Sequence, residues 1–189
     1  LVPLDAQGIH ITGIPDLAGS AHFNETLFED VDLPEDALLG EEGNGWAQCM
    51  GELAIERSGP ERFLTTFVIL EQALSALSDR LDDNGAAIVG RLVAHLMALR
   101  QMSRGISRLL EDGLPADTEA ALVKQMGNAF EKGVVESIRK LLTALPRKEW
   151  PPGLQLLLDD AVLRLPANTL RGGTTEILHG IIARQLGMR

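Results

Sequence analysis

The feature that most constrains this chain is the helical spacing of its apolar residues from Trp46 onward. Apolar side chains recur there at every third or fourth position, which is the period of a helix with one buried face. Short breaks rich in glycine, proline and aspartate separate the periodic stretches. The pattern predicts helices over residues 45–78, 86–111, 117–142, 154–165 and 174–186, with Pro60 either kinking the first helix or marking a break. Long helices joined by short connections predict a mostly α fold, an up-and-down antiparallel four-helix bundle with a short C-terminal helix.

Residues 1–43 follow a different pattern. Gly8–Thr12 alternates apolar and polar residues like a strand, and Phe23–Val31 has strand-like spacing until Pro34 ends it. Two or three strands are too few to make a stable sheet alone. We therefore expect part of a β-domain over residues 1–43, followed by an α-helical bundle domain over residues 44–189.

Charge and composition exclude several classes of function. The 17 Lys and Arg residues against 27 Asp and Glu residues give a net charge of −10, with no basic run. This balance argues against nucleic acid or an anionic membrane as a partner. The first residues lack a basic region followed by an apolar run, and no apolar stretch of this sequence reaches membrane-spanning length, so we expect neither a leader nor a membrane span and predict a cytoplasmic protein. A chain that begins with Leu1 rather than Met suggests a fragment or a trimmed chain.

Metal-binding signatures are also missing from the sequence. Cys49 is the only cysteine, which excludes an intrachain disulfide and a cysteine-based metal site. The four histidines are scattered, with no pair at ligand spacing. We expect no metal.

The tail of the chain, Arg171–Arg189, reads R-G-G-T-T-E-I-L-H-G-I-I-A-R-Q-L-G-M-R. Gly173 with Glu176 three residues later, and Thr174 beside it, predicts the capped start of a helix. The first N–H groups of such a helix favour an anion or a developing oxyanion. Taken alone, the segment fits either an ordinary capped helix or one wall of a ligand site.

A second candidate is the pair Glu56-Arg57, which lies in a predicted helix among apolar neighbours. A carboxylate facing the interior of a bundle would have its pKa raised by desolvation and could act as a base. The alternative is a solvated pair on the outer face of the helix.

Three segments, in this order, resemble the C-terminal part of the acyl-CoA dehydrogenase family. They are Phe23–Trp46 (F-N-E-T-L-F-E-D-V-D-L-P-E-D-A-L-L-G-E-E-G-N-G-W), Glu56-Arg57, and the tail motif G-G-T-T-E-I-L-H-G-I-I-A-R. The resemblance covers the whole chain but only the second half of the family. The family's N-terminal helical domain and the first part of its middle β-domain have no counterpart.

The resemblance implies an oxidoreductase of lipid and fatty acid metabolism. In the family, a carboxylate removes the α-proton of an acyl-CoA thioester while a hydride leaves the β-carbon for FAD. A flavin hydroxyl and one backbone N–H polarise the thioester oxygen, and the electrons pass to an electron-transferring flavoprotein. A homo- or hetero-oligomer formed through the bundle is also implied. We expect the chain alone to be incomplete and inactive; the alternative is a non-catalytic subunit that pairs with a catalytic partner.

The resemblance also assigns roles to individual residues. Gly172 stands where many members carry the catalytic Glu, so it keeps only the polarising backbone N–H. Glu56 matches the base that isovaleryl- and long-chain-type members carry on the long helix, and Arg57 is the candidate for binding and ordering the substrate. The cofactor-binding candidates are Gly173, Thr174 and Thr175, which match positions near the flavin and its phosphates.

Two segments depart from the family pattern. The family's Arg-x-x-Phe-Gly segment is replaced by S-D-R-L-D-D-N-G around Arg80, and its glycine pair near the adenine is replaced by S-I-R-K-L-L-T-A-L over Ser137–Leu145. Both lie at the intersubunit end of the flavin site in the family. They indicate a divergent member, consistent with one subunit type of a mixed assembly.

Overall fold

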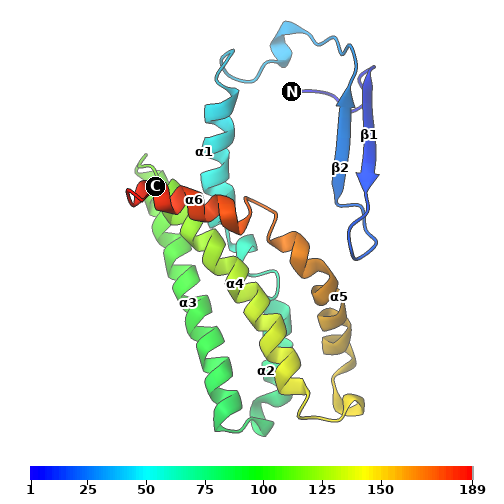
Figure 1. The fold of residues 1–189 in the computed structure, drawn as a ribbon, viewed down its shortest axis with the longest axis vertical. Helices are drawn as coiled ribbons and strands as arrows, with labels where there is room; N and C mark the ends of the chain where they lie inside the picture. The colour runs from blue at the N-terminus through cyan, green and yellow to red at the C-terminus, as the bar shows by residue number, and fades with distance from the viewer. Residues whose placement is uncertain (189) are drawn as a thin grey trace. The chain divides into compact units, whose positions relative to one another are not determined.

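The computed structural model describes residues 1–188 and divides the chain into two compact units (Figure 1). The first unit is Leu1–Glu52 and the second begins at Leu53, inside the first helix. The domain boundary that we expect at residues 43 and 44 precedes this helix and stays a prediction.

The first unit contains a two-stranded antiparallel sheet. Strand β1 (Ile9–Ile14) pairs with β2 (Phe23–Phe28) in a register that sets Ile9 opposite Phe28 and Ile14 opposite Phe23. The second strand ends earlier than the predicted Val31, because the chain turns at Asp30, whose φ of 49° is left-handed. Most side chains of both strands are exposed, as expected for a sheet too small to enclose a core.

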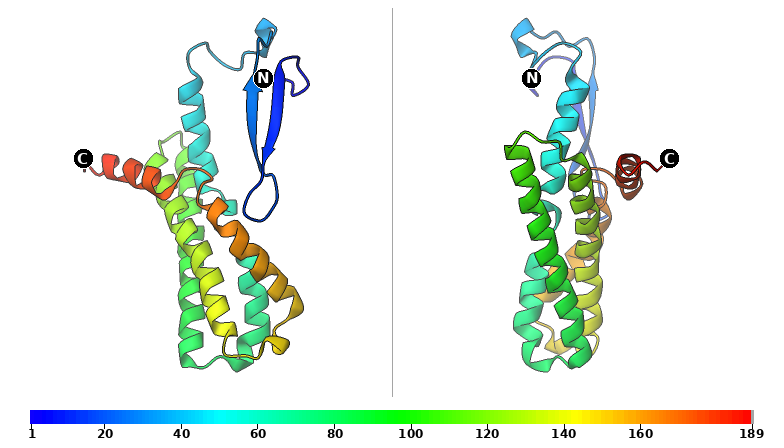
Figure 2. Two further views of the ribbon diagram at one scale, coloured as in Figure 1. Left: turned by 45° about the vertical axis from the view of Figure 1, so that its right-hand side comes forward. Right: turned by 90° about the vertical axis from the view of Figure 1, so that its left-hand side faces the viewer.

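The second unit is the predicted up-and-down bundle. Its helices are the end of α1 (Gly45–Ser58), α2 (Phe67–Leu77), α3 (Asp83–Glu111), α4 (Asp117–Leu142), α5 (Pro152–Asn168) and α6 (Thr175–Gln185), with short 3-10 turns η2 (Pro60–Arg62), η3 (Ser78–Arg80) and η4 (Arg147–Glu149). Helices α2 to α5 alternate in direction, and α6 lies across one end of α4 (Figure 2). Within residues 1–188, none of the helices combines the length and apolar character that crossing a membrane requires.

The predicted first helix over residues 45–78 is broken rather than kinked. Helix α1 ends at Ser58, Gly59 takes an extended conformation, and η2 separates it from α2. Pro60 has no N–H to donate to a preceding turn and its ring crowds the carbonyl one turn earlier, which favours a break here. Helix α5 is longer than the predicted residues 154–165 at both ends: Pro152 is tolerated in the first turn, and the helix continues through Pro166 to Asn168.

Helix α4 is the centre of the bundle, since it packs against α2, α3, α5 and α6. The large apolar side chains that are fully buried around it are Leu70, Leu99, Ile106, Phe130, Ile138, Leu142, Leu154, Leu158 and Leu178. One close approach requires glycine: a Cβ atom on Gly127 would stand 2.4 Å from the backbone oxygen of Arg62. The turn that carries Arg62 therefore rests directly on α4.

Candidate functional site

The predicted site residues meet at one end of the bundle. Glu56 and Arg57 occupy the last turn of α1, and Gly172 and Gly173 lie in the segment between α5 and α6. A Cβ atom on Gly172 would stand 3.5 Å from Arg57 Cγ and 3.6 Å from Glu56 Oε1. The fold thus brings together residues that are far apart in the sequence.

Arg57 holds the glycine segment. Its Nε donates a 2.7 Å hydrogen bond to the carbonyl oxygen of Gly172, and only 3% of the residue is exposed. Burial lowers the pKa of Arg57, while the nearby carboxylates of Asp117 and Glu56 oppose that shift. Since its guanidinium is almost wholly buried against the segment, this geometry favours the ordering role over broad contact with a substrate.

Glu56 is held by a cation that the sequence did not reveal. Arg62 in η2 donates through Nε to the backbone oxygen of Glu56, at 2.9 Å, and through its guanidinium to Glu56 Oε1. The Glu56 side chain remains 35% exposed. Within residues 1–188 its second oxygen, Oε2, has no hydrogen-bond donor. One carboxylate oxygen is anchored, and the other is left for an incoming group.

The turn before α6 depends on glycine. Gly172 and Gly173 have φ angles of 68° and 113°, which side chains other than glycine rarely adopt. The predicted helix start is confirmed, with Thr174 at the N-cap position in an extended conformation, although its side chain makes no capping hydrogen bond. Two hydrogen bonds lower the pKa of Glu176: one from the backbone N–H of Glu176 itself and one from the Thr174 hydroxyl.

The N–H of Gly172 has no acceptor within the part of the chain that the structure describes. A free N–H beside a carboxylate is the pairing that the chemistry of a thioester α-carbon needs. Gly172, whose N–H has no acceptor within residues 1–188, lies close to the Glu56 carboxylate.

A buried polar cluster lies beneath this segment, and sequence reasoning missed it. Lys124 and Glu131 of α4 are each only 1% exposed. Burial, with the neighbouring Arg62 and Arg171, lowers the pKa of Lys124 to about 8. Burial raises the pKa of Glu131. The one available signal was their place at core-facing positions of an otherwise apolar helical stripe, next to Val123 and Phe130.

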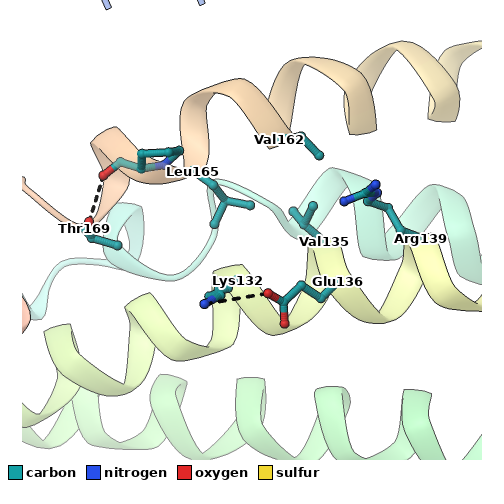
Figure 3. A pocket seen from close by; sticks show the side chains of 8 residues that line it. Lys132, Val135, Glu136, Arg139, Val162, Leu165 and Thr169 are labelled. Carbon is teal, nitrogen blue, oxygen red and sulfur yellow. Dashed lines mark hydrogen bonds and ion pairs between the residues drawn. The ribbon is translucent and has the colours of Figure 1, made fainter. Parts of the chain in front are cut away.

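The segments that depart from the family pattern lie elsewhere in the bundle. The Arg80 guanidinium pairs with Glu149 at 3.3 Å. Arg139 lines a hollow of about 310 Å³ between α4 and α5, where its side chain points toward the space between Val135 and Val162 (Figure 3). None of the predicted site residues lines this hollow.

Comparison with known proteins finds homologues that are acyl-CoA dehydrogenases. The chain is 30% identical to acyl-CoA dehydrogenase IpdE1 of Mycobacterium tuberculosis (strain ATCC 25618 / H37Rv) over 216 aligned residues. This alignment covers 100% of the chain and 50% of the relative. It is 25% identical over 190 residues to acyl-CoA dehydrogenase FadE34 of the same organism, covering 98% of the chain and 26% of that relative. No protein-family model matches. The chain is a divergent homologue of acyl-CoA dehydrogenases, and it corresponds to their C-terminal portion.

Solved structures support the same fold. The prolyl acyl carrier protein oxidase AnaB matches with a TM-score of 0.84 at 18% identity, over 99% of this chain and 51% of that one. The Tcur3481-Tcur3483 steroid ACAD matches with a TM-score of 0.78 at 22% identity, over 100% of this chain and 51% of that one. The glutaryl-CoA complex of glutaryl-coenzyme A dehydrogenase matches with a TM-score of 0.74 at 17% identity, over 100% of this chain and 50% of that one. The chain therefore spans about half the length of IpdE1 and of these structures.

Proposed function

We propose that the protein that carries this chain dehydrogenates an acyl-CoA thioester between its α- and β-carbons, with Glu56 as the base. The observation that carries the proposal is the position of the Glu56 carboxylate: Oε1 lies 3.6 Å from where a side chain on residue 172 would begin, and many family members carry their base at that residue. Glu56 Oε2 accepts the α-proton, while the Arg62 guanidinium holds Oε1 in place. The base reaches the site from α1 because residue 172 has no side chain to supply one.

The polarising donor in this proposal is the N–H of Gly172. A thioester oxygen placed there gains a hydrogen bond that strengthens as negative charge develops on it. Arg57 fixes the neighbouring carbonyl, so the Gly172 backbone does not turn away from the substrate. The role of Arg57 is therefore to order the site and, through it, the substrate.

The start of α6 fits the polar groups of a flavin. Its first-turn N–H groups have no intrahelical acceptor, Gly173 brings backbone close to a ligand, and the half-buried Thr174 and Thr175 contribute hydroxyls. We propose that these three residues contact FAD. The chemistry that bound FAD supplies is hydride acceptance, followed by electron transfer to an electron-transferring flavoprotein.

Flavin reduction tests the proposal directly. We expect the natural protein to purify with FAD, and its visible flavin absorbance to bleach when a straight-chain acyl-CoA from a screened panel is added without oxygen. Stoichiometric flavin that no thioester in the panel bleaches would contradict dehydrogenation of this substrate class.

The second candidate function is a non-catalytic subunit that pairs with a catalytic partner. It is favoured by the Arg80–Glu149 ion pair, because the arginine that resembles the family's flavin-binding residue is already paired within this chain. The same absorption spectrum separates the candidates. Protein that is colourless alone, and whose complex with a flavin-loaded partner of the same family contains only the partner's share of flavin, would support this second function.

We further propose that the bundle associates with a second copy through α3. An exposed stripe at heptad spacing runs along this helix: Asp83, Ala87, Gly90, Ala94, Met97, Gln101, Arg104 and Arg108. The stripe is acidic at its start, small and apolar in its middle, and basic at its end. Its order is self-complementary, because antiparallel pairing about a two-fold axis sets Asp83 against Arg108 and Ala94 against Met97.

Charge reversal tests this association. We expect Arg108→Asp to weaken it by placing Asp83 of each copy opposite a like charge. The double variant Asp83→Arg with Arg108→Asp should restore it, since the opposite charges then meet again. Sedimentation velocity measures the mass, and Arg91→Asp, an exposed α3 residue outside the stripe, is the matched control. A mass that is the same in all four proteins would contradict the proposed interface.

A further inference from the structure

Lys124 is a buried cation that the proposed chemistry does not use. Its side chain lies within the bundle on α4, with only 1% of the residue exposed. Burying an ammonium group costs free energy unless hydrogen bonds replace its water. The contacts that replace water therefore indicate what the residue does.

Those contacts lead to the glycine segment. Lys124 Nζ donates to the backbone oxygen of Asn168 at 3.0 Å and to the side-chain oxygen of Asn128 at 2.5 Å. Asn168 is the last residue of α5, where the chain enters the segment. At the other end, Lys124 Cε lies 3.5 Å from the position of a Cβ atom on Gly172. One side chain thus supports both ends of residues 168–172.

The side chain of Asn168 extends this support. It accepts from the Arg171 guanidinium at 2.8 Å and donates to Glu131 Oε2 at 3.4 Å. Glu131 Oε1 in turn accepts from the backbone N–H of Thr65, at 3.0 Å, in the turn before α2. The segment is therefore held from α4 on one side, while Arg57 holds the Gly172 carbonyl from α1.

We propose that Lys124 is a positioning residue of the candidate site: its ammonium fixes the segment from Asn168 to Gly172, and so sets where the Gly172 N–H stands relative to the Glu56 carboxylate. The proposal rests on the proposed function, because it deepens the account of the same site. Lys124 touches no reacting atom; it acts through the backbone that it holds.

A role in folding alone does not explain a lysine here. Apolar side chains in place of the whole buried cluster, Lys124 together with Glu131, would fill the same space without the cost of burying charge, and such joint replacements are often neutral or stabilising. The charged groups that face Lys124 are Arg62 and Arg171, which lower its pKa, and Glu131 and Glu56, which raise it. With burial, the balance leaves a pKa of about 8. The ammonium therefore loses its proton as pH rises through about 8, within the range where the site can be assayed.

The test compares Lys124→Met with Lys132→Met, an exposed lysine on the same helix. In the natural protein, we expect Lys124→Met to speed amide hydrogen exchange of residues 168–173 at least tenfold, while the α3 and α4 core stays protected. With the best thioester of the panel, kcat should fall by roughly 10- to 100-fold and KM should change less, because the site is displaced rather than lost. Exchange and kcat equal to those of Lys132→Met would overturn the proposal.

Two further measurements keep the outcome clear. In the unmodified protein, kcat should fall as pH rises through about 8, and a flat profile from neutral to alkaline pH would count against Lys124 even where Lys124→Met does not fold. A failure of the proposed function would give a different result, because turnover would survive Glu56→Gln. Faster amide exchange of residues 168–173 in Lys124→Met would still support the positioning role in that case.

Discussion

Replacing Glu56 with glutamine should lower the rate of thioester dehydrogenation by a factor of roughly 10² to 10⁴, the usual contribution of a general base. Glutamine keeps the size of the side chain and can still contact Arg62, but its amide cannot accept the α-proton. Because Glu56 is half-exposed and lies outside the buried core, the folded structure should persist. The variant therefore isolates the proton transfer from the stability of the bundle.

Two measurements separate the steps. Exchange of the substrate α-proton with deuterated solvent, followed by NMR, reports the base alone, whereas bleaching of the flavin reports hydride transfer. Both should be lost in Glu56→Gln and kept in Glu52→Gln, which removes an exposed carboxylate one turn earlier on the same helix. Unchanged α-proton exchange in Glu56→Gln would remove this residue from the mechanism.

Gly127→Ala should destabilise the bundle by about 3 kcal/mol, the scale of overpacking in a closed core. The added Cβ would stand 2.4 Å from the backbone oxygen of Arg62, so either α4 or the η2 turn must move. For a domain of this size, the midpoint of thermal unfolding should fall by roughly 6–12 °C. The displacement of Arg62 would also loosen its hold on Glu56.

Gly133→Ala is the matched control on the same helix. A Cβ there would have its nearest neighbour, Leu92 Cδ2, at 3.9 Å, which is ordinary van der Waals contact. Since alanine favours the helix over glycine by about 1 kcal/mol, this variant should be as stable as the parent or more so. Differential scanning calorimetry measures both. Equal midpoints for the two variants would show that the contact with Arg62 is not a tight one.

The bundle could be predicted because its signal is local and repeated. The apolar spacing of residues 86–111 and 117–142 matches α3 and α4 almost to their ends, since each turn of helix adds independent evidence. The tail motif and the Glu56-Arg57 pair likewise pointed to segments that the fold brings together. What they do chemically at that place stays a prediction for the experiments above.

The polar partners of the site could not be predicted in the same way. Arg57 reaches Gly172 across 115 residues of sequence, and Lys124 reaches Asn168 across 44. No local period reports such a meeting, because it depends on how whole helices pack. Lys124 and Glu131 also go against the general tendency of charged residues to lie at the surface. Their residue types therefore predict exposed positions, whereas both side chains are buried.

The interruption at Gly59 and Pro60 does more than shorten a helix. In an unbroken helix, residues six apart are separated by about 9 Å along the axis and point in different directions, so a cation at position 62 could not reach a carboxylate at position 56. The break folds the chain back, and Arg62 meets both the backbone and the side chain of Glu56. The helix break thus places a positive charge beside this carboxylate. Any change that made the helix continuous through residues 59 and 60 would leave Glu56 without its counter-ion.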